Sequence, residues 1–421
     1  MLNYARENKG KFLLIVGIVF MWLLLLALFQ WYGYNKTLAL WKVPARAPIF
    51  LDFRLIPGSA ESFAHGYEPS IENPYDPTQR IFNYPAFWRL FFYTGITQDD
   101  TTWIVILMII LFFCGVILFP QNISIASALW MLLIVFSPAS MLLYERGNVD
   151  LIVFLICVLT ILALDYSTSM AAAILVFGAV VKMFPLFGLT IFLREPKRRS
   201  ILILLASILF MVAYSSATFE SQRAAWSTTA RGGDKSYGAF VFISRFNSYF
   251  QTFSSNLFSF NQWRLIFELG VLVLILLAVI LAIREEQPLL ASHERNLTAF
   301  RMGASIYIGT FILGNNWDYR LAFLVLVIPQ LSDWFQETTK RYQRVVVAMM
   351  IGVVLSCWYL FLKIDLPLIP FKDPSNRVFV LDEVINWLLV PGFAYLLVTS
   401  SPDWLKQPLQ KTFSVFKKDM A

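Results

Sequence analysis

The run FLLIVGIVFMWLLLLALFQW spans residues 12–31 and contains no charged side chain. A helix needs about 20 mostly apolar residues to cross the hydrocarbon core of a bilayer. Arg6, Lys9 and Lys11 precede the run, and it lacks the small-residue cleavage site of a signal peptide. The stretch therefore predicts an uncleaved membrane anchor.

The composition of the whole chain is that of a membrane protein. Of its 421 residues, 58% are hydrophobic and 14% are charged, whereas soluble domains average about 45–50% and about 25%. This excludes a soluble globular enzyme, a disordered protein and a fibrous protein. Further apolar runs lie at residues 101–119, 122–143, 149–164, 170–193, 201–219, 264–283, 300–313, 319–332, 344–362 and 384–400. Because lipid cannot satisfy open strand edges, these runs predict an all-α integral membrane protein, a polytopic bundle of about 10–12 transmembrane helices.

Basic residues indicate the orientation of this bundle, because cytoplasmic loops carry an excess of Lys and Arg. The clusters expected in the cytoplasm are the N-terminal one, Arg194–Arg199, Lys340–Arg344 and the basic tail. The long polar stretches then lie on the opposite face: residues 32–82, 220–262 and 363–383. We expect one integral domain over residues 1–402, a basic cytoplasmic tail over 403–421, and both termini in the cytoplasm. A bacterial inner membrane is the expected location, with an endoplasmic reticulum membrane left open.

The segment Tyr84–Ile96 decides the topology of the first half of the chain. It is shorter than an ordinary span. If it crosses the membrane, all the basic clusters lie on the cytoplasmic side, as expected. If it lies on the surface, the topology of the first half inverts.

The long first non-cytoplasmic loop places a carboxylate beside an apolar segment. Asp52 follows Ile49-Phe50-Leu51 in a loop that is rich in aromatic, Pro and acidic residues, and long loops of this kind are functional or disordered. A carboxylate in a low dielectric has a raised proton affinity and can accept the proton of an attacking hydroxyl group. Asp52 is therefore the candidate general base. The alternative is that it caps a helix beginning near Arg54.

Lys182 lies in the middle of the apolar run AAAILVFGAVVKMFPLFGL. A charge at mid-depth costs roughly 2.5–3.5 kcal/mol on insertion scales, so it must be compensated. The compensating group is either an intramembrane acid, such as Glu145, Asp150 or Glu268, or the phosphate of an anionic lipid. Pro185 is expected to break the helix three residues later.

A short polar turn, Tyr144–Asp150, separates two of the apolar runs. Its polar residues can simply cap the two helices that flank the turn. Alternatively, Arg146 and Asn148 reach a phosphate or a sugar hydroxyl.

A second polar turn, Gly314–Arg320, also lies between two apolar runs. Its charged and amide side chains are Asn315, Asn316, Asp318 and Arg320. Asn and Asp can hold sugar hydroxyls, and Arg can bind a phosphate with two parallel hydrogen bonds. Trp317 can stack on a pyranose ring or serve as an ordinary interfacial aromatic residue.

Several common kinds of site receive no support. The chain has no G-x-x-x-x-G-K-[ST], H-E-x-x-H, G-x-S-x-G or C-x-x-C pattern. Its three cysteines lie inside apolar runs and its two histidines are far apart, so neither a disulfide framework nor a zinc site is expected. The net charge of +7 follows from the cytoplasmic basic clusters, so no nucleic-acid partner is expected.

The order of these motifs resembles that of polytopic GT-C glycosyltransferases. The motifs are FLDFR at 50–54, Asn73-Pro74-Tyr75, Asn83-Tyr84-Pro85, Arg146-Gly147-Asn148, Lys182-x-x-Pro185 and Asn315-Asn316-x-Asp318-Tyr319-Arg320. The resemblance is closest to glycosyltransferase family 87, which includes mannosyltransferases that use polyprenyl-phosphate-mannose. Two positions depart from the family pattern: Ala86 replaces a second Pro, and no Asp-x-Asp pair surrounds Asp52, so a divalent metal is not supported.

The resemblance implies a hexosyltransferase, by the family's habit a mannosyltransferase. The donor would be a polyprenyl-phosphate-linked sugar and the acceptor a lipid-linked or envelope glycan, with transfer on the non-cytoplasmic face. Asp52 would act as the base of a single inverting displacement, without a cofactor. Lys182, Arg146 and Arg320 are the candidates for binding the donor phosphate. The candidates for binding the sugar or the acceptor are Tyr84, Asn148, Asn315, Asn316, Trp317 and Asp318.

Two other functions stay open at this point. A flippase of lipid-linked oligosaccharides would also have many spans and buried cations, but would not need a base in a long outer loop. A polysaccharide polymerase or ligase would use a diphosphate-linked lipid donor. Membrane lipids surround the protein in each case.

Overall fold

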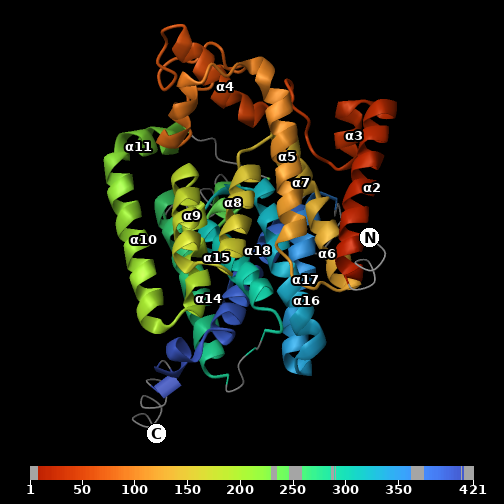
Figure 1. Cartoon of the computed structure of the whole chain (residues 1–421), viewed down its shortest axis with the longest axis vertical. Coiled ribbons are helices and arrows are strands. Elements are labelled where there is room, and N and C mark those ends of the chain that lie inside the picture. The colour runs from red at the N-terminus through yellow and green to blue at the C-terminus, as the bar shows by residue number, and fades with distance from the viewer. Residues whose placement is uncertain are drawn as a thin grey trace.

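The computed structural model consists mainly of helices (Figure 1). It describes residues 8–228, 235–245, 258–285, 289, 291–361, 374–408 and 410–411. Much of the predicted tail 403–421, and parts of the polar stretches 220–262 and 363–383, lie outside these ranges. Long helices stand side by side in the body of the molecule, and the first loop forms a cap above them (Figure 1).

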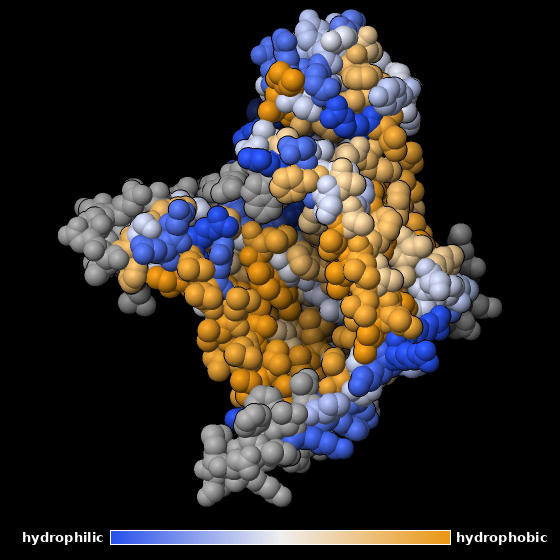
Figure 2. Space-filling view, turned by 90° about the vertical axis from the view of Figure 1, so that its left-hand side faces the viewer, coloured by the Kyte–Doolittle hydropathy of each residue, from blue (hydrophilic) through white to orange (hydrophobic). Residues whose placement is uncertain are grey.

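Six helices of the described chain are individually long and apolar enough to cross a membrane. They are α2 (Lys9–Tyr32), α5 (Thr101–Leu118), α10 (Lys197–Ala217), α14 (Phe260–Ile283), α17 (Lys340–Trp358) and α18 (Pro374–Thr399). A seventh span results if α6 (Ile125–Val135) and α7 (Pro138–Arg146) are joined across their 51° bend. Figure 2 shows the broad apolar band expected of a lipid-facing surface, with hydrophilic residues above and below it. The predicted class, an all-α polytopic membrane protein, is confirmed.

Most of the other predicted spans are short or interrupted helices: α8 (Asp150–Ala163), α9 (Thr168–Val181), η3 (Phe184–Arg194), η4 (Asp318–Val327) and α16 (Ile328–Glu337). The exception is α15 (Glu294–Leu313), a continuous helix of 20 residues that is not among the six apolar ones. Both α15 and η4 are buried along most of their length. The described chain therefore has fewer continuous spans than the 10–12 or so that its apolar runs suggest. Helices that are covered by protein rather than lipid can be shorter and broken.

The predicted span 170–193 is a hairpin rather than one helix. Helix α9 stops where Lys182 adopts an extended conformation (φ −159°, ψ 123°), and Pro185 prevents the α-helix from resuming. The chain then turns back through η3. At its end Arg194 donates a hydrogen bond to the Leu164 carbonyl at 2.8 Å and pairs with Asp165 at 3.7 Å. Both ends of the hairpin therefore lie at the same end of the bundle.

Because of this hairpin, the number of crossings agrees with the orientation expected from the basic clusters even though residues 84–96 do not form a span. The helix in that segment, η1 (Ala86–Tyr93), lies in the cap, where Trp88 donates a hydrogen bond to the Val181 carbonyl at 3.0 Å. Three passes, α5, α6–α7 and α8, lead from the cap to the far end of the bundle, and the hairpin returns there. Arg194–Arg199 consequently lies at the end opposite the cap. The sequence required an extra crossing only because it counted 170–193 as one span.

The cap is a folded unit rather than an open loop. It is built on α4 (Leu51–Ala64) together with η1 and η2 (Gln98–Asp100). Asn73 donates hydrogen bonds to Ser59 Oγ at 3.0 Å and to the Arg80 carbonyl at 2.8 Å. The rings of Phe63 and Phe92, 5.4 Å apart, pack η1 against α4. The short elements elsewhere are α3 (Tyr34–Leu40), α11 (Phe219–Thr228), α12 (Val241–Arg245) and η5 (Tyr359–Phe361).

A two-stranded ribbon fixes the turn between α15 and η4. Strands β1 (Ser236–Tyr237) and β2 (Asn316–Trp317) pair antiparallel, with Ser236 opposite Trp317 and Tyr237 opposite Asn316. The ribbon depends on a close backbone approach, since a Cβ atom on Gly238 would lie 2.2 Å from the Gly314 carbonyl oxygen. Gly238 also has φ +146°, a conformation that favours glycine.

We predict that Gly238→Ala lowers the melting temperature of the detergent-solubilised protein more than Gly66→Ala does. Both positions have positive φ, which costs of order 1–3 kcal/mol for another residue. Only Gly238 also faces a backbone atom, whereas nothing lies within 4 Å of a Cβ at Gly66. Equal losses in the two variants, measured by thermal unfolding, would contradict the proposed close approach.

Candidate functional site

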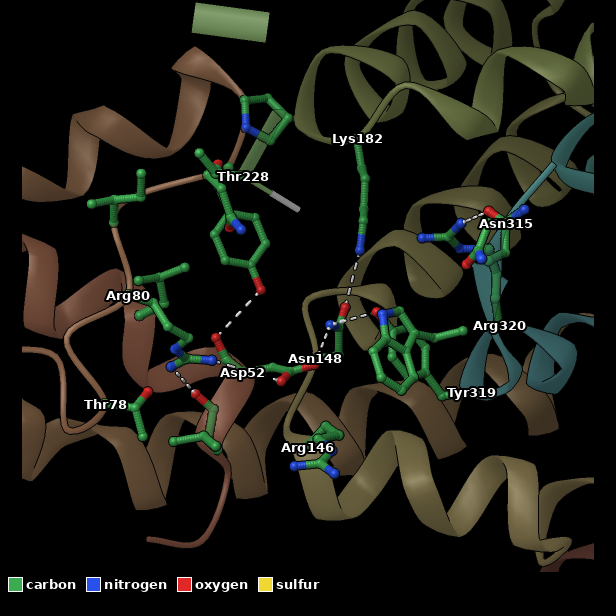
Figure 3. Close-up of a pocket in the computed structure, with 18 of the residues that line it drawn as sticks. Asp52, Thr78, Arg80, Arg146, Asn148, Lys182, Thr228, Asn315, Tyr319 and Arg320 are labelled. Atoms are coloured by element: carbon green, nitrogen blue, oxygen red, sulfur yellow. Dashed lines mark hydrogen bonds and ion pairs between the residues drawn. The ribbon is translucent and has the colours of Figure 1, made fainter. Parts of the chain in front are cut away.

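A cavity of about 800 Å³ lies where the cap meets the turns between the helices (Figure 3). Its wall is formed by α4 and the rest of the cap, the α7–α8 turn, the α9–η3 break and the ribbon turn. All but one of the predicted site residues line it: Asp52, Tyr84, Arg146, Asn148, Lys182, Asn315, Asn316, Trp317 and Arg320. Segments that are distant in the sequence therefore converge on one cavity. The exception is Asp318.

Asp52 lies in the first turn of α4 and is one quarter exposed to the cavity. The helix begins at Leu51, and Asp52 forms no capping hydrogen bond with its backbone. Instead Asp52 Oδ2 accepts a hydrogen bond from Asn148 Nδ2 at 2.9 Å. The phenol of Tyr84 donates to the Asp52 backbone carbonyl at 3.4 Å. The capping alternative considered from the sequence is thus wrong, and the carboxylate points into the cavity (Figure 3).

Asn148 connects three walls of the cavity. Besides Asp52, its Nδ2 donates to the hydroxyl of Tyr319 at 3.1 Å, and its Oδ1 accepts from Lys182 Nζ at 3.1 Å. Gly147, in the left-handed conformation (φ 57°), ends α7 and allows this turn. The side chain of Asn148 is buried, so these bonds fix its amide and, through it, the position of the carboxylate.

The compensating group for Lys182 is Asp150. Lys182 Nζ lies 2.5 Å from Asp150 Oδ1, and Arg320 Nε lies 3.2 Å from Oδ2 of the same carboxylate. The Asp150 side chain is fully buried. The Arg320 guanidinium also stands over the Phe184 ring at 4.5 Å and donates to Asn316 Oδ1. Two cations thus share one carboxylate, so these three side chains have an excess of one formal positive charge.

Arg146 pairs with a different acid. Its Nε lies 3.2 Å from Glu145 Oε2, and Glu145 Oε1 accepts a hydrogen bond from the backbone of Arg46 at 2.8 Å. The Glu145 side chain is fully buried, whereas Arg46 is exposed. Figure 3 shows Arg146 and Lys182 on opposite sides of Asn148. The three cations predicted to bind one phosphate therefore form two separate groups.

The ribbon turn contributes a mixed wall. Trp317 and Tyr319 lie with their rings nearly parallel, 5° apart in plane and 6.5 Å between centroids, and Asn315 and Asn316 line the cavity beside them. Asp318 is buried behind this wall, where its Oδ2 accepts a hydrogen bond from the Tyr359 hydroxyl at 2.9 Å. The structure does not bring Asp318 to the cavity with the other predicted residues.

Arg80 is a lining residue to which the sequence assigned no role. Its Nη1 lies 3.9 Å from Asp52 Oδ1. Its Nη2 donates to the Leu51 carbonyl at 2.6 Å and to Asp76 Oδ1 at 2.8 Å. Burial acts to raise the pKa of Asp76, but the hydrogen bonds and charge of Arg80 outweigh it and hold this pKa below its usual value. Asp76 and Arg80 carry opposite charges four residues apart, and this spacing is the sequence feature that could have indicated their pairing.

Tyr319 was also not among the candidate site residues. Its hydroxyl accepts a hydrogen bond from Asn148 inside the site.

No three His, Cys, Asp or Glu side chains of the described chain come together as potential metal ligands.

Comparison with known proteins gives one family match. The model described as "Glycosyltransferase family 87" matches residues 82–306, slightly more than half of the chain. The matched region includes Tyr84, Arg146, Asn148 and Lys182, whereas Asp52 and the ribbon turn 314–320 lie outside it. No curated protein and no solved structure matches the chain.

We predict that Asp150→Asn strongly destabilises the protein. The substitution keeps the shape of the side chain but leaves Lys182 and Arg320 without their shared carboxylate, and breaking a buried pair costs about 3–5 kcal/mol. The matched control is Glu68→Gln, which removes an acid from a half-exposed pair with Arg89, where about 0–1 kcal/mol is expected. Thermal and denaturant unfolding in detergent measure both. Equal stability of the two variants would show that the buried cations need no compensation.

Proposed function

Because the chain belongs to glycosyltransferase family 87 and is thus a glycosyltransferase, we propose that it transfers a hexose from a polyprenyl-phosphate-linked donor to a lipid-linked or envelope glycan. The observation that supports this donor is a cavity in which cations and a carboxylate meet beside an apolar, membrane-facing surface. Mannose is the sugar that the sequence resemblance suggests. Family membership sets the flippase alternative aside.

In this proposal Lys182 and Arg320 bind the phosphate of the donor. Together with Asp150 they carry a net positive charge, and Arg320 presents a planar fork of donors suited to phosphate oxygens. As the bond between the sugar and the phosphate breaks, negative charge develops on the leaving oxygen. Fixed cations in a site with little water stabilise that charge.

Asp52 is the general base. An acceptor hydroxyl attacks the anomeric carbon, its proton passes to Asp52, and the C–O bond to the phosphate breaks on the opposite face, which inverts the configuration. Asn148 and Arg80 hold the two carboxylate oxygens from different sides. Positioning of this kind reduces the entropy that must be lost in the transition state.

The sugar lies between these two groups, against the mixed wall of the cavity. Tyr84, Asn315 and Trp317 line it there, with Asn148 and Asn316 held in the wall by their own hydrogen bonds. A flat aromatic face with amides beside it suits a pyranose ring, which has apolar faces and polar edges.

In this proposal the prenyl chain of the donor lies in a separate groove of about 450 Å³. The groove is lined by Met183, Leu186, Ile208, Met211, Val212, Ser215, Ser216, Phe219 and Gln222, from η3, α10 and α11. Its lining residue Met183 directly follows Lys182 in the chain, at the break between α9 and η3. On the face shown in Figure 2 the apolar surface is hollowed between two ridges.

We propose the non-cytoplasmic face of a bacterial inner membrane as the place of transfer. The basic run Arg194–Arg199 lies at the end of the bundle opposite the cap, which supports a cytoplasmic position for that end. Both termini are then cytoplasmic, and the cavity opens on the outer side.

We predict that Asp52→Asn lowers kcat by at least about 100-fold, the usual contribution of a general base. Binding of the donor should change little, because the amide has the same shape. The matched control is Asp99→Asn, an exposed acid of the cap outside the cavity, which should transfer at the normal rate. Release of polyprenyl phosphate from a purified polyprenyl-phosphate-hexose measures both. Transfer at the normal rate by the Asp52 variant removes it from the mechanism.

We predict that Ser215→Trp selectively impairs long-chain donors. The indole would fill the groove, and losing about 1.4 kcal/mol of apolar contact lowers kcat/KM about tenfold. A donor with only two isoprene units should be affected much less. Ala213→Trp, exposed on α10 outside the groove, is the control. Equal loss for long and short donors would place the prenyl chain elsewhere.

A further inference from the structure

Arg80 and Asp52 face each other across a short gap in the wall of the cavity. Arg80 Nη1 lies 3.9 Å from Asp52 Oδ1, which is too far for a direct hydrogen bond. Both residues line the cavity, and their side chains are 30% and 25% exposed. Figure 3 shows them next to each other, with Asn148 on the other side of Asp52. Two opposite charges that attract each other therefore stop short of contact.

Arg80 cannot move closer to Asp52, because its other donors are bound. Nε donates to Asp76 Oδ2 at 3.1 Å, and Nη2 donates to Asp76 Oδ1 at 2.8 Å and to the Leu51 carbonyl at 2.6 Å. The Asp76 side chain is fully buried, and a carboxylate that binds two nitrogens of one guanidinium fixes its plane and position. Nη1 makes no hydrogen bond with the residues that the structure describes, so its N–H groups remain available to a ligand.

Asp52 is held through one oxygen only. Its Oδ2 accepts the hydrogen bond of Asn148 Nδ2 at 2.9 Å, and Asn148 is itself fixed by Lys182 Nζ at 3.1 Å. Oδ1, which faces Arg80, accepts no hydrogen bond from any described residue. A donor position and an acceptor position therefore lie side by side in the cavity, and neither satisfies the other.

The loop that carries Arg80 keeps an unfavourable backbone conformation. Gln79 has φ 54°, in the left-handed region that residues with a side chain seldom adopt. The buried Asp76 carboxylate holds the loop in this shape, because it accepts hydrogen bonds from the backbone N–H groups of Thr78 at 3.1 Å and Arg80 at 2.9 Å. Strain of this kind is typical of sites where a side chain must be held in one place. Arg80 directly follows the strained residue.

A hydroxyl group fits the gap between these two side chains. It has one proton to donate and lone pairs that accept. Because Asp52 Oδ1 and Arg80 Nη1 are only 3.9 Å apart, one oxygen can make hydrogen bonds of about 2.7–3.0 Å with both atoms. Its proton then points to Asp52 and one of its lone pairs to Arg80. The other lone pair is left to attack the sugar.

We propose that Arg80 is a second catalytic residue, which binds the oxygen of the attacking hydroxyl, and that Asp76 is the positioning residue that fixes Arg80. The inference rests on the proposed function. In the reaction the hydroxyl proton passes to Asp52 Oδ1, and the oxygen forms a bond to the anomeric carbon. The electron pair of the broken C–O bond leaves with the phosphate. Arg80 keeps its protons and stabilises the negative charge that develops on the attacking oxygen.

The test measures release of polyprenyl phosphate from polyprenyl-phosphate-mannose. The nucleophile is octyl α-mannoside or, in its absence, water, since both present a hydroxyl group. Arg80→Gln should lower kcat about 100-fold with either nucleophile, the effect of losing one donor to a developing charge, and leave the KM of the donor unchanged. The matched control is Arg89→Gln, an arginine of the cap that pairs with Glu68 outside the cavity. It should react at the normal rate.

Two further variants separate catalysis by Arg80 from a structural role. Arg80→Lys loses the planar fork that binds Asp76, as Arg80→Gln does, but it keeps a charged donor. Both variants should lose the same stability in thermal unfolding, whereas the kcat of Arg80→Lys should exceed that of Arg80→Gln about tenfold, the effect of one hydrogen bond to a charged group. The double variant Arg80→Gln/Asp76→Asn removes the pair together, so that no buried carboxylate is left uncompensated, and should have the kcat of Arg80→Gln.

The positioning role of Asp76 is tested by Asp76→Asn. This variant keeps Arg80 but frees its guanidinium to contact Asp52 directly and to close the gap to the hydroxyl. We expect kcat to fall about tenfold, again the effect of one hydrogen bond to a charged group, while the KM of the donor stays the same. A normal kcat in this variant would show that Asp76 does not position Arg80.

The inference and the proposed function fail separately. A normal kcat in Arg80→Gln, or an equal loss in Arg80→Lys and Arg80→Gln, overturns the inference and keeps the proposed function. A rise in the KM of the donor in the Arg80 variants also overturns it, since Arg80 would then bind the donor. Absence of release by the unaltered protein with both nucleophiles overturns the proposed function and the inference with it.

Discussion

The site depends on one buried ion group, Asp150 held between Lys182 and Arg320. An unpaired charge at this depth in an apolar bundle would be too costly to keep. The shared carboxylate makes two cations tolerable in the place where α9 breaks and η4 begins. This group fixes the inner wall of the cavity, and the cap is positioned against it through Asn148.

Stability alone does not explain why such a group is retained. A buried ion pair is often no more stable than well-packed apolar residues of similar size. Here, moreover, the group has an excess of cations and interrupts a helix of the bundle at Lys182. A structural salt bridge would favour balanced charges within continuous helices. An incomplete charge balance facing a cavity is what the binding of an anion requires.

The sequence predicted the parts of this fold that depend on local composition. Apolar runs identify the helices, and the cost of burying Lys182 required a partner, for which Asp150 was one of three candidates. The break at Pro185 was also expected. That the chain then turns back through η3 was not, because a proline shows where a helix ends but not the direction in which the chain continues.

Residues whose role depends on tertiary contacts were harder to predict. From the sequence alone Asp52 was ambiguous between a helix cap and a base, because its hydrogen bond with Asn148, 96 residues away, depends on the fold. Asp318 belongs to a polar turn like its neighbours, but backbone pairing of β1 with β2 directs it away from the cavity, toward Tyr359. Arg80 received no role, because its position between Asp76 and Asp52 depends on how the cap folds.

The position of the cavity relates the membrane composition of the chain to the chemistry proposed for it. A prenyl-linked sugar has an apolar chain, a charged phosphate and a polar ring, and these parts differ in where they are soluble. The protein presents a surface suited to each part: an apolar groove, two cations and a polar cavity with a carboxylate. A soluble enzyme would have to extract the chain from the bilayer at about 0.8 kcal/mol per CH₂ group. A site built between spans leaves the chain in an apolar environment, so the binding energy of the phosphate and sugar remains available for the transition state.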